Sequence, residues 1–189
     1  LPLLLALAIQ RPEWSFILVG PIGEADPSTE VVDLKACSNV YFFGSQPYGD
    51  LPAWASHADV ALLPLQLNGY TRHMFPMKLF EYLAAGLPVV ATAIPALQEH
   101  ADVATLCTPD ASTFAAAIDQ VLQGQGPARS QRLQRAKGQT YEKRTRSMLD
   151  LLEHLGVMAE AEQGNPQRSR MHRSRLDRVV AWAMSPLER

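Results

Sequence analysis

Short apolar runs alternate along the chain with longer segments whose apolar residues recur at helical spacing. This alternation is typical of an α/β fold, in which helices cover both faces of a parallel sheet. We therefore predict a Rossmann-like parallel sheet with helices on both faces. The expected strands are residues 15–20, 39–43, 59–64, 87–92 and 103–107, and the expected helices are residues 2–10, 29–36, 50–57, 76–85, 110–123, 127–137 and 140–157, with a short helix starting around Pro95.

The segment 76–92 carries the clearest local pattern. Pro76 suits the first position of a helix, because its missing N–H would have no helical partner there. Gly86 is placed for a left-handed cap at the helix end, and Pro88 prevents the helix from resuming. The apolar run 87–91 is then expected to be a strand covered on both faces.

Two charged side chains share one face of this predicted helix. Lys78 and Glu81 are three residues apart, so they can serve the same ligand. Met77, Phe80 and Ala84 line another face and are expected to pack on the sheet. A lysine and a glutamate near the start of a helix that follows a long loop suit a diphosphate and a ribose. The plain alternative is an exposed ion pair.

The binding edge follows from the order of the elements. In an open α/β sheet, ligands bind beyond the carboxyl ends of the strands. That rule selects residues 20–23, 44–48, 66–75 and 92–95. Gly20 would let a ligand approach the backbone closely because glycine has no side chain, although the residues alone favour a simple tight turn after the strand.

The loop before the helix holds Asn68, Thr71, Arg72 and His73. The N–H groups at a helix start carry partial positive charge and suit phosphate oxygens. Arg72 and Lys78 would add positive side chains to such a diphosphate site. A solvated loop followed by a surface lysine is the alternative that composition alone favours.

Bulk properties are those of a globular protein with 189 residues, 47% hydrophobic and 19% charged. A formal net charge of −2 argues against a general nucleic-acid binder. Cys37 and Cys107 are isolated in the sequence and indicate reduced thiols in a cytoplasmic protein. The apolar residues 1–9 have no basic leader and are too short to span a bilayer, so we expect a core-facing helix there.

The last part of the chain has a different character. Residues 165–189 contain six arginines but only Asp177 and Glu188 as acidic residues. We divide the chain into a domain at 1–160 and a basic tail at 161–189. The residues leave two readings of this tail open, a solvated segment and a peripheral contact with an anionic membrane face.

A resemblance to a known family rests on several segments in one order. Residues 76–86, Pro-Met-Lys-Leu-Phe-Glu-Tyr-Leu-Ala-Ala-Gly, resemble the Pro-x-Lys-x-x-Glu-Tyr-Leu-Ala-x-Gly variant of the donor-binding motif of GT-B fold, group 1 (family-four-like) glycosyltransferases. The further segments are Phe-Ile-Leu-Val-Gly at 16–20, Asn-Val-Tyr-Phe-Phe-Gly at 39–44, Asp-Leu-Pro at 50–52 and Ala-Asp-Val-Ala-Leu-Leu-Pro at 58–64. Together they extend the resemblance over roughly residues 1–155.

This resemblance implies the C-terminal, donor-binding half of a GT-B fold, whose N-terminal domain lies outside the sequence. It also implies a third reading of the tail at 161–189, as the C-terminal helix that crosses back onto that N-terminal domain. Glu81 matches a glutamate that accepts hydrogen bonds from the ribose hydroxyls of the donor. His73 stands where commoner relatives have a glutamate that contacts the donor sugar. No residue is assigned to catalysis. The implied donor-binding residues are Gly20, Ser45, Asn68, Thr71, Arg72, Lys78 and Glu81.

The implied function is transfer of a sugar from a nucleoside diphosphate sugar, UDP-linked, to a glycan or lipid-linked acceptor. The isolated chain would be incomplete and inactive without the N-terminal domain. The alternative is a non-catalytic nucleotide-sugar-binding or scaffold subunit, and a sugar-nucleotide epimerase of similar fold is a third reading that lacks evident catalytic carboxylates. We expect no metal, no cofactor and no nucleic-acid partner. The expected location is cytoplasmic, with peripheral contact at the inner membrane face as one role of the tail.

Overall fold

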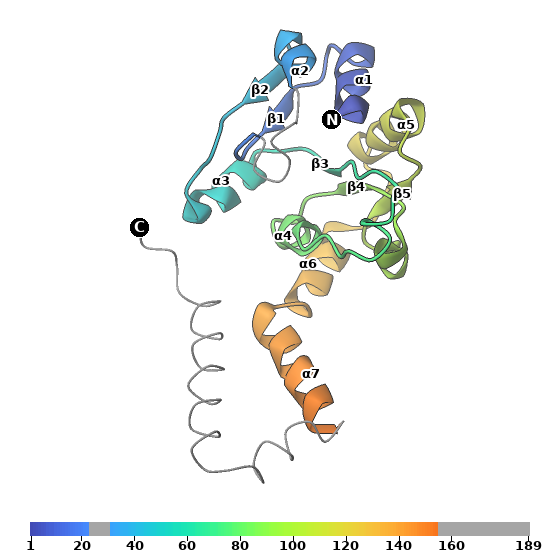
Figure 1. The fold of residues 1–189 in the computed structure, drawn as a ribbon. Coiled ribbons are helices and arrows are strands. Elements are labelled where there is room, and N and C mark those ends of the chain that lie inside the picture. Colours follow the sequence, from blue (N-terminus) through green and yellow to red (C-terminus); the bar gives the residue numbers. More distant parts are fainter. Residues whose placement is uncertain (23–30, 155–189) are drawn as a thin grey trace. The chain divides into compact units, whose positions relative to one another are not determined.

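A computed structural model describes residues 1–22 and 31–154 (Figure 1). The chain divides into two compact units, Leu1–Gly138 and Gln139–Arg189. The boundary at residue 160 and the basic tail lie outside the described residues, so that domain division remains a prediction.

The first unit contains the predicted elements in the predicted order; α1 has its predicted bounds, and most of the others are shorter than predicted. Its strands are β1 (Phe16–Leu18), β2 (Val40–Phe42), β3 (Ala61–Leu63), β4 (Val89–Thr92) and β5 (Thr105–Cys107). Its α-helices are α1 (Pro2–Gln10), α2 (Val32–Ala36), α3 (Leu51–Ser56), α4 (Lys78–Ala84), α5 (Ala111–Leu122) and α6 (Arg129–Lys137). Two 3₁₀ helices, η1 (Tyr48–Asp50) and η2 (Pro95–His100), precede α3 and follow β4.

Every strand pairing in the described residues is parallel, as predicted, but the hydrogen bonds form two groups. β1 pairs with β2, with Phe16 opposite Val40. β4 lies between β3 and β5 in a second group of three strands. The four residues of β4 are all buried, which agrees with the continuous apolar run in its sequence.

Helices cover both faces of the strands (Figure 1). Successive strand residues point to opposite faces, so Val90 joins one apolar cluster while Val89 and Ala91 join the other. The first cluster packs α1, α2 and α5 on the strands. The second packs α4 and η2 on the opposite face. This three-layer arrangement confirms the Rossmann-like α/β prediction.

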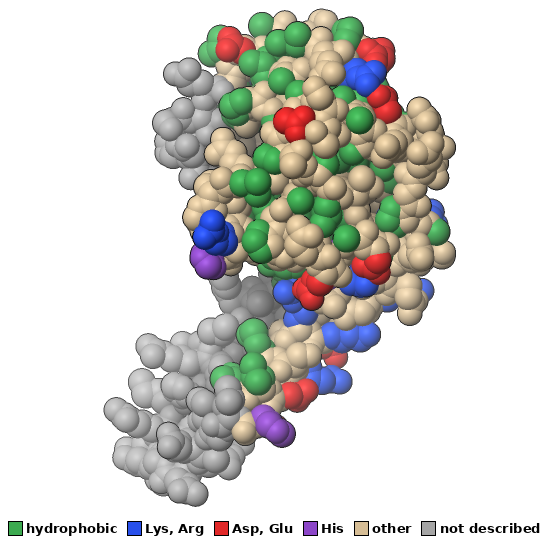
Figure 2. Space-filling model, turned by 90° about the vertical axis from the view of Figure 1, so that its right-hand side faces the viewer, with side chains coloured by type: hydrophobic (Ala, Val, Ile, Leu, Met, Phe, Trp, Pro, Cys, Tyr) green, Lys and Arg blue, Asp and Glu red, His purple; other side chains and the backbone are tan. Residues whose placement is uncertain are grey.

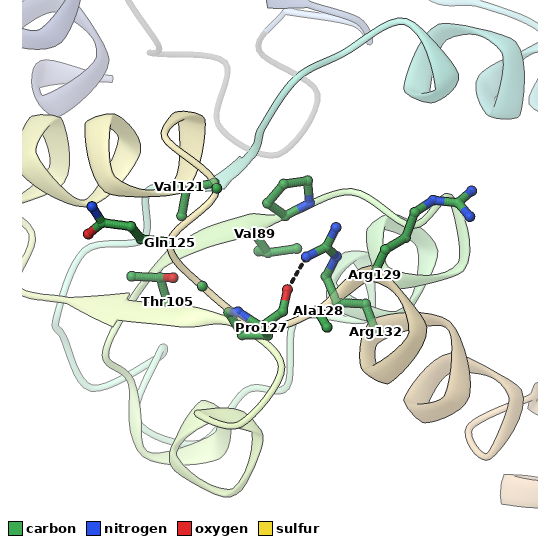
Figure 3. Close-up of a pocket in the computed structure, with 11 residues that line it drawn as sticks. Val89, Thr105, Val121, Gln125, Pro127, Ala128, Arg129 and Arg132 are labelled. Carbon is green, nitrogen blue, oxygen red and sulfur yellow. Dashed lines mark hydrogen bonds between the residues drawn. The ribbon is translucent and has the colours of Figure 1, made fainter.

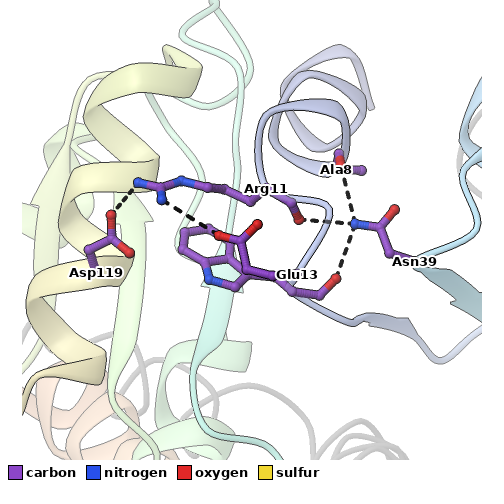
Figure 4. A network of polar contacts seen from close by, with 6 residues as sticks. Ala8, Arg11, Glu13, Asn39 and Asp119 are labelled. Atoms are coloured by element: carbon purple, nitrogen blue, oxygen red, sulfur yellow. Dashed lines mark hydrogen bonds and ion pairs between the residues drawn. The ribbon is translucent and has the colours of Figure 1, made fainter.

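A single amide side chain fixes the amino-terminal edge of the strands (Figure 4). The Nδ2 group of Asn39 lies 3.1, 3.1 and 3.0 Å from the carbonyl oxygens of Ala8, Arg11 and Trp14. Arg11 also pairs with Asp119 of α5 and lies 5.0 Å from the centroid of the Trp14 ring. The end of α1 is therefore tied to both β2 and α5.

Asp110 caps the start of α5. Its carboxylate accepts the backbone N–H of Thr113 at 2.8 Å and the hydroxyls of Thr108 and Thr113 at 2.5 and 2.6 Å. The hydrogen bonds from Thr108 and Thr113 lower the pKa of Asp110 to about 2.

This cap makes part of the stability depend on pH. Because the pKa of Asp110 in the folded chain lies below its ordinary value of 3.8, its contribution is complete above about pH 4 and is lost as the pH falls through about 2. The stability difference between the parent and Asp110→Asn, measured by urea unfolding, should therefore shrink with acidification. Asp59→Asn, at another exposed carboxylate, is the control, and a pH-independent difference for Asp110→Asn would contradict the expectation.

In the described residues, the helix of the second unit is α7 (Tyr141–His154), which is amphipathic. Met148, Leu149, Leu151 and Leu152 are exposed on it, and Arg146 pairs with Glu142 at 3.2 Å. No helix among the described residues is long and apolar enough to cross a membrane. On the described part of the face in Figure 2, Lys and Arg side chains stand in small groups, several of them beside Asp or Glu.

Candidate functional site

The carboxyl ends of the parallel strands bring the predicted loops to one edge. The loops after β1 and β2 are joined there, because the N–H of Gly20 donates to the carbonyl of Gly44 at 2.8 Å. Their φ angles of +135° and +64° lie in the region that favours glycine. Ser45 follows Gly44 and is exposed. Gly20 and Ser45 therefore lie on neighbouring loops, and the N–H of Gly20 is already bonded within them.

The loop between β3 and α4 is tied to the end of β4. The hydroxyl of Thr92, a completely buried side chain, donates to the carbonyl of Leu65 at 2.7 Å. This bond crosses from one strand end to the next, so it fixes the point at which the loop leaves the sheet. It places residues 66–75 at the edge where ligands of open α/β sheets bind.

Asn68 and Thr71 shape this loop through reciprocal hydrogen bonds. The N–H of Asn68 donates to Thr71 Oγ1 at 3.0 Å, and the N–H of Thr71 donates to Asn68 Oδ1 at 2.9 Å. The Thr71 hydroxyl also donates to the carbonyl of Gln66 at 2.5 Å, and the residue is only 5% exposed. These two side chains hold the loop in shape, while Arg72 and His73 next to them are exposed.

The start of α4 differs from the prediction. Met77 is the N-cap residue and the helix begins at Lys78, so Pro76 lies outside the helix rather than at its first position. The N–H groups of Leu79 and Phe80 donate to the carbonyls of Pro76 and Met77 at 3.0 and 3.1 Å. A tight turn therefore forms at the start of α4, and it uses two N–H groups whose hydrogen bonds an anion could otherwise accept.

Lys78 and Glu81 lie together on one face of α4, as the sequence predicted. Lys78 Nζ is 3.9 Å from Glu81 Oε2, and the two side chains are 65% and 39% exposed. Such an exposed pair contributes little to stability, about 0.2–0.5 kcal/mol. The pair is therefore available to a ligand at low cost. Burial, and secondarily the charge of Glu81, raise the pKa of the adjacent Tyr82.

The buried face of α4 is formed by Leu79, Phe80 and Leu83. Phe80 packs on the sheet as predicted, and half-buried Met77 packs against the same apolar cluster, but Ala84 is exposed. The prediction for Ala84 was wrong. Leu79 and Leu83 occupy the core-facing positions of the helix, so Ala84 lies on the side that faces solvent.

The end of α4 is the predicted left-handed glycine cap. Gly86 has φ +76°, its N–H donates to the carbonyl of Leu83, and the N–H of Leu87 donates to the carbonyl of Tyr82, both at 3.0 Å. The Gly86 carbonyl in turn accepts from Nε and Nη2 of Arg132 in α6, at 3.1 and 2.8 Å. The helix that carries Lys78 and Glu81 is thus held at its C-terminal end by a distant arginine.

Arg132 was not found by sequence reasoning. It is 8% exposed, and its Nη1 donates to the carbonyl of Pro127. Burial, with the neighbouring Arg129 charge, lowers its pKa. The charge can stay buried because two donors bind the Gly86 carbonyl at the negative end of α4, and the third binds the carbonyl of Pro127 just before α6. No local motif marks this role.

A buried histidine supports the other side of α4. The rings of Phe75, Phe80 and His100 pack with centroids 5.2–5.5 Å apart. Arg135 Nη1 donates to His100 Nδ1 at 2.9 Å, and Arg135 Nη2 donates to Asp102 at 2.6 Å. This cluster connects the end of the 66–75 loop with α4, η2 and α6.

One hollow of about 220 Å³ lies at the opposite edge (Figure 3). Val89 and Thr105, the first residues of β4 and β5, line it together with Val121, Gln125, Pro127 and Arg132. It therefore contains none of the predicted donor-binding residues. Among the described residues, no group of three His, Cys, Asp or Glu side chains could hold a metal ion.

Comparison with known proteins relates this geometry to a family. Residues 2–124 match the family model for glycosyl transferases group 1. TuaH of Bacillus subtilis, whose name describes a teichuronic acid biosynthesis glycosyltransferase, is 35% identical over 88 residues. That match covers 47% of this chain and 22% of TuaH, so the chain spans about a fifth of the length of this relative.

A solved structure agrees at the level of the fold. Sucrose-phosphate synthase from Thermosynechococcus elongatus superimposes with a TM-score of 0.65 and 23% identity, over 82% of this chain and 42% of that protein. The parallel α/β architecture, the order of the loops at the binding edge and the family match over residues 2–124 lead to one assignment. The chain belongs to the group 1 glycosyltransferases.

Proposed function

We propose that this chain forms the donor-binding half of a glycosyltransferase. The whole enzyme would move a sugar from a nucleoside diphosphate sugar, UDP-linked, to a glycan or lipid-linked acceptor. The observation that carries the proposal is the Lys78–Glu81 pair, which is accessible on α4 at the carboxyl edge of the strands. The name of TuaH, which refers to teichuronic acid biosynthesis, favours a glycan acceptor.

Each charged residue has a distinct role in this proposal. Glu81 accepts hydrogen bonds from the ribose hydroxyls, since a carboxylate can bind two vicinal hydroxyls. Lys78 and Arg72 bind the diphosphate and stabilise the negative charge that develops on it as the sugar leaves. Asn68 and Thr71 position the loop that carries Arg72. This chemistry is electrostatic, and the proposal includes no metal.

The acceptor and the remaining catalytic groups are assigned to an N-terminal domain outside this sequence. An open half-site admits water, which weakens the interactions that stabilise the leaving group. The chain alone is therefore expected to bind nucleotide without transferring sugar. Peripheral membrane contact through the basic tail remains a separate proposal, because that tail lies outside the described residues.

The diphosphate role of Lys78 can be tested with two ligands. Lys78→Ala should weaken UDP binding about tenfold or more and leave uridine binding nearly unchanged, because only UDP carries the diphosphate. Titration calorimetry of both ligands measures the difference. Lys137→Ala, which removes another exposed lysine, is the matched control.

The same titration separates the two candidate functions. A scaffold subunit that has lost its site would give no saturable signal with UDP. Equal losses of UDP and uridine affinity in Lys78→Ala would instead show that Lys78 acts on the fold rather than on the phosphates.

A further inference from the structure

The hollow at the amino edge of β4 and β5 is lined by two positive charges (Figure 3). Arg129 and Arg132 both belong to α6 and are three residues apart, so their side chains share one side of that helix. Among the described residues, no aspartate or glutamate lines the hollow. The positive charge of its walls is therefore not balanced by any acidic group within them.

Arg132 carries its charge in the interior without a carboxylate partner among the described residues. It is buried, and its Nε, Nη1 and Nη2 groups donate only to the carbonyls of Gly86 and Pro127. A guanidinium has five N–H groups, so one N–H on Nη1 and one on Nη2 remain after these bonds. Buried charges in proteins are usually paired, and an anion in the hollow would supply that pair.

Arg129 is the second donor at this hollow. In the part of the chain that the structure describes, it has neither a hydrogen bond nor an ion pair. Its side chain lies over the end of α4, since a Cβ added to Gly86 would stand 2.7 Å from its Nε. Burial, and secondarily the charge of Arg129, lower the pKa of Arg132. The two cations thus repel each other, and an anion bound between them would offset this repulsion.

The size of the hollow limits the ligand to a small molecule. Its volume of about 220 Å³ equals that of about seven water molecules, at roughly 30 Å³ each. Pockets for drug-sized ligands measure about 300–1,000 Å³, so a nucleoside diphosphate sugar would not fit. Gly126 keeps the space open, because a Cβ there would stand 3.7 Å from Val121 and 3.9 Å from the hydroxyl oxygen of Thr105.

The rest of the lining combines polar and apolar groups. Half-buried Thr105 contributes a hydroxyl that has no hydrogen-bond partner among the described residues, and Gln125 contributes an amide. Pro88, Val89 and Val121 contribute apolar surface. These walls suit a ligand with one strongly charged anionic group and a short organic part that carries both C–H and O–H groups.

We propose that this hollow binds a small phosphate monoester. Such a compound carries a charge of about −1.5 to −2 at pH 7, which matches the two arginines. Its oxygens accept charge-assisted hydrogen bonds from Arg129 and from the remaining N–H groups of Arg132. Its organic part lies against the first residues of β4 and β5. Lys78 and Glu81 lie at the opposite edge of the strands, so this binding is independent of the proposed donor site.

An NMR titration of the 189-residue chain with glycerol 3-phosphate at low salt tests the proposal. The amides of Gln125, Gly126 and Arg129 should shift saturably, with a dissociation constant of about 1 mM or lower. Arg129→Met should weaken this binding about tenfold. The variant should keep its fold, because Arg129 is exposed. Lys137→Met, which removes an exposed positive charge at the other end of α6, is the control and should bind like the parent.

Two further ligands define the chemical class. Glycerol has no charge and should give no saturable shift at the hollow. Inorganic phosphate lacks the organic part and should bind at least about threefold more weakly than glycerol 3-phosphate, since burial of one CH₂ group is worth about a factor of four in affinity.

Three results would overturn the proposal. Unchanged affinity in Arg129→Met would remove the arginines from the site. Equal affinities for inorganic phosphate and glycerol 3-phosphate would contradict a monoester ligand. Shifts confined to the amides around Lys78 would place the anion at the donor site instead. Lys78→Ala should leave the shifts at the hollow unchanged, so failure of this site and failure of the proposed donor site can be distinguished.

Discussion

The Arg132→Met variant is expected to lose about 3 kcal/mol of unfolding free energy. The substitution removes the donors to the buried carbonyl of Gly86 and to the carbonyl of Pro127. A buried acceptor that loses its partner costs about 1–3 kcal/mol. Urea unfolding followed by far-UV circular dichroism measures the loss as a lower midpoint at an unchanged slope.

Arg129→Met is the matched control for this experiment. It makes the same change of charge and side chain in the same helix, but Arg129 is exposed. Exposed substitutions of this kind usually change stability by less than about 0.5 kcal/mol. Equal losses in the two variants would mean that the charge of α6, rather than the bonds to Gly86, stabilises the fold.

Glu81→Gln is expected to weaken UDP binding about ten- to a hundredfold. This is the cost of replacing the charged acceptor of two ribose hydroxyls, roughly 1.5–3 kcal/mol. Folding should be almost unaffected, because the side chain is 39% exposed and its ion pair with Lys78 spans 3.9 Å. Calorimetry gives the affinity, and the urea midpoint shows whether the fold is intact.

Glu13→Gln provides a control at the opposite edge of the strands. Glu13 is an exposed glutamate that pairs with the half-buried Arg11 at 3.6 Å, and it lies just before β1. Its variant should bind UDP like the parent. Parent-like affinity in Glu81→Gln would remove Glu81 from the donor site, while a loss in both variants would indicate a general effect of charge.

The order of elements could be predicted because each one carries a local mark. The run at 87–91 has no polar residue and follows a helix stop, which predicts a strand covered on both faces. All four residues of β4 are buried, as this prediction requires. Gly86 could be assigned to a left-handed cap because the helical pattern ends there and Pro88 follows, and its φ is +76°. The position of Lys78 beside Glu81 followed from helical spacing alone.

Other features could not be predicted, because they depend either on residues far apart in the sequence or on a local backbone conformation that the residue types do not specify. Arg132 binds Gly86 across 46 positions, and nothing around Arg132 marks it as buried. Proline suits the first turn of a helix, which predicts Pro76 inside α4. In the structure Pro76 lies outside the helix, and its carbonyl accepts the N–H of Leu79 in a tight turn. The reciprocal bonds of Asn68 and Thr71 depend on a loop conformation that composition does not specify.

The bond between α6 and the end of α4 has a consequence for proteolysis. A single cut between residues 123 and 128 would separate α6 from the segment 2–124 that matches the family model. The carbonyl of Gly86 would then lose Arg132, and α4 would fray from its C-terminal end. Nucleotide affinity would fall although every residue proposed to touch the nucleotide is intact. Protease resistance of this short connection is therefore a sensitive measure of whether the donor helix is in place.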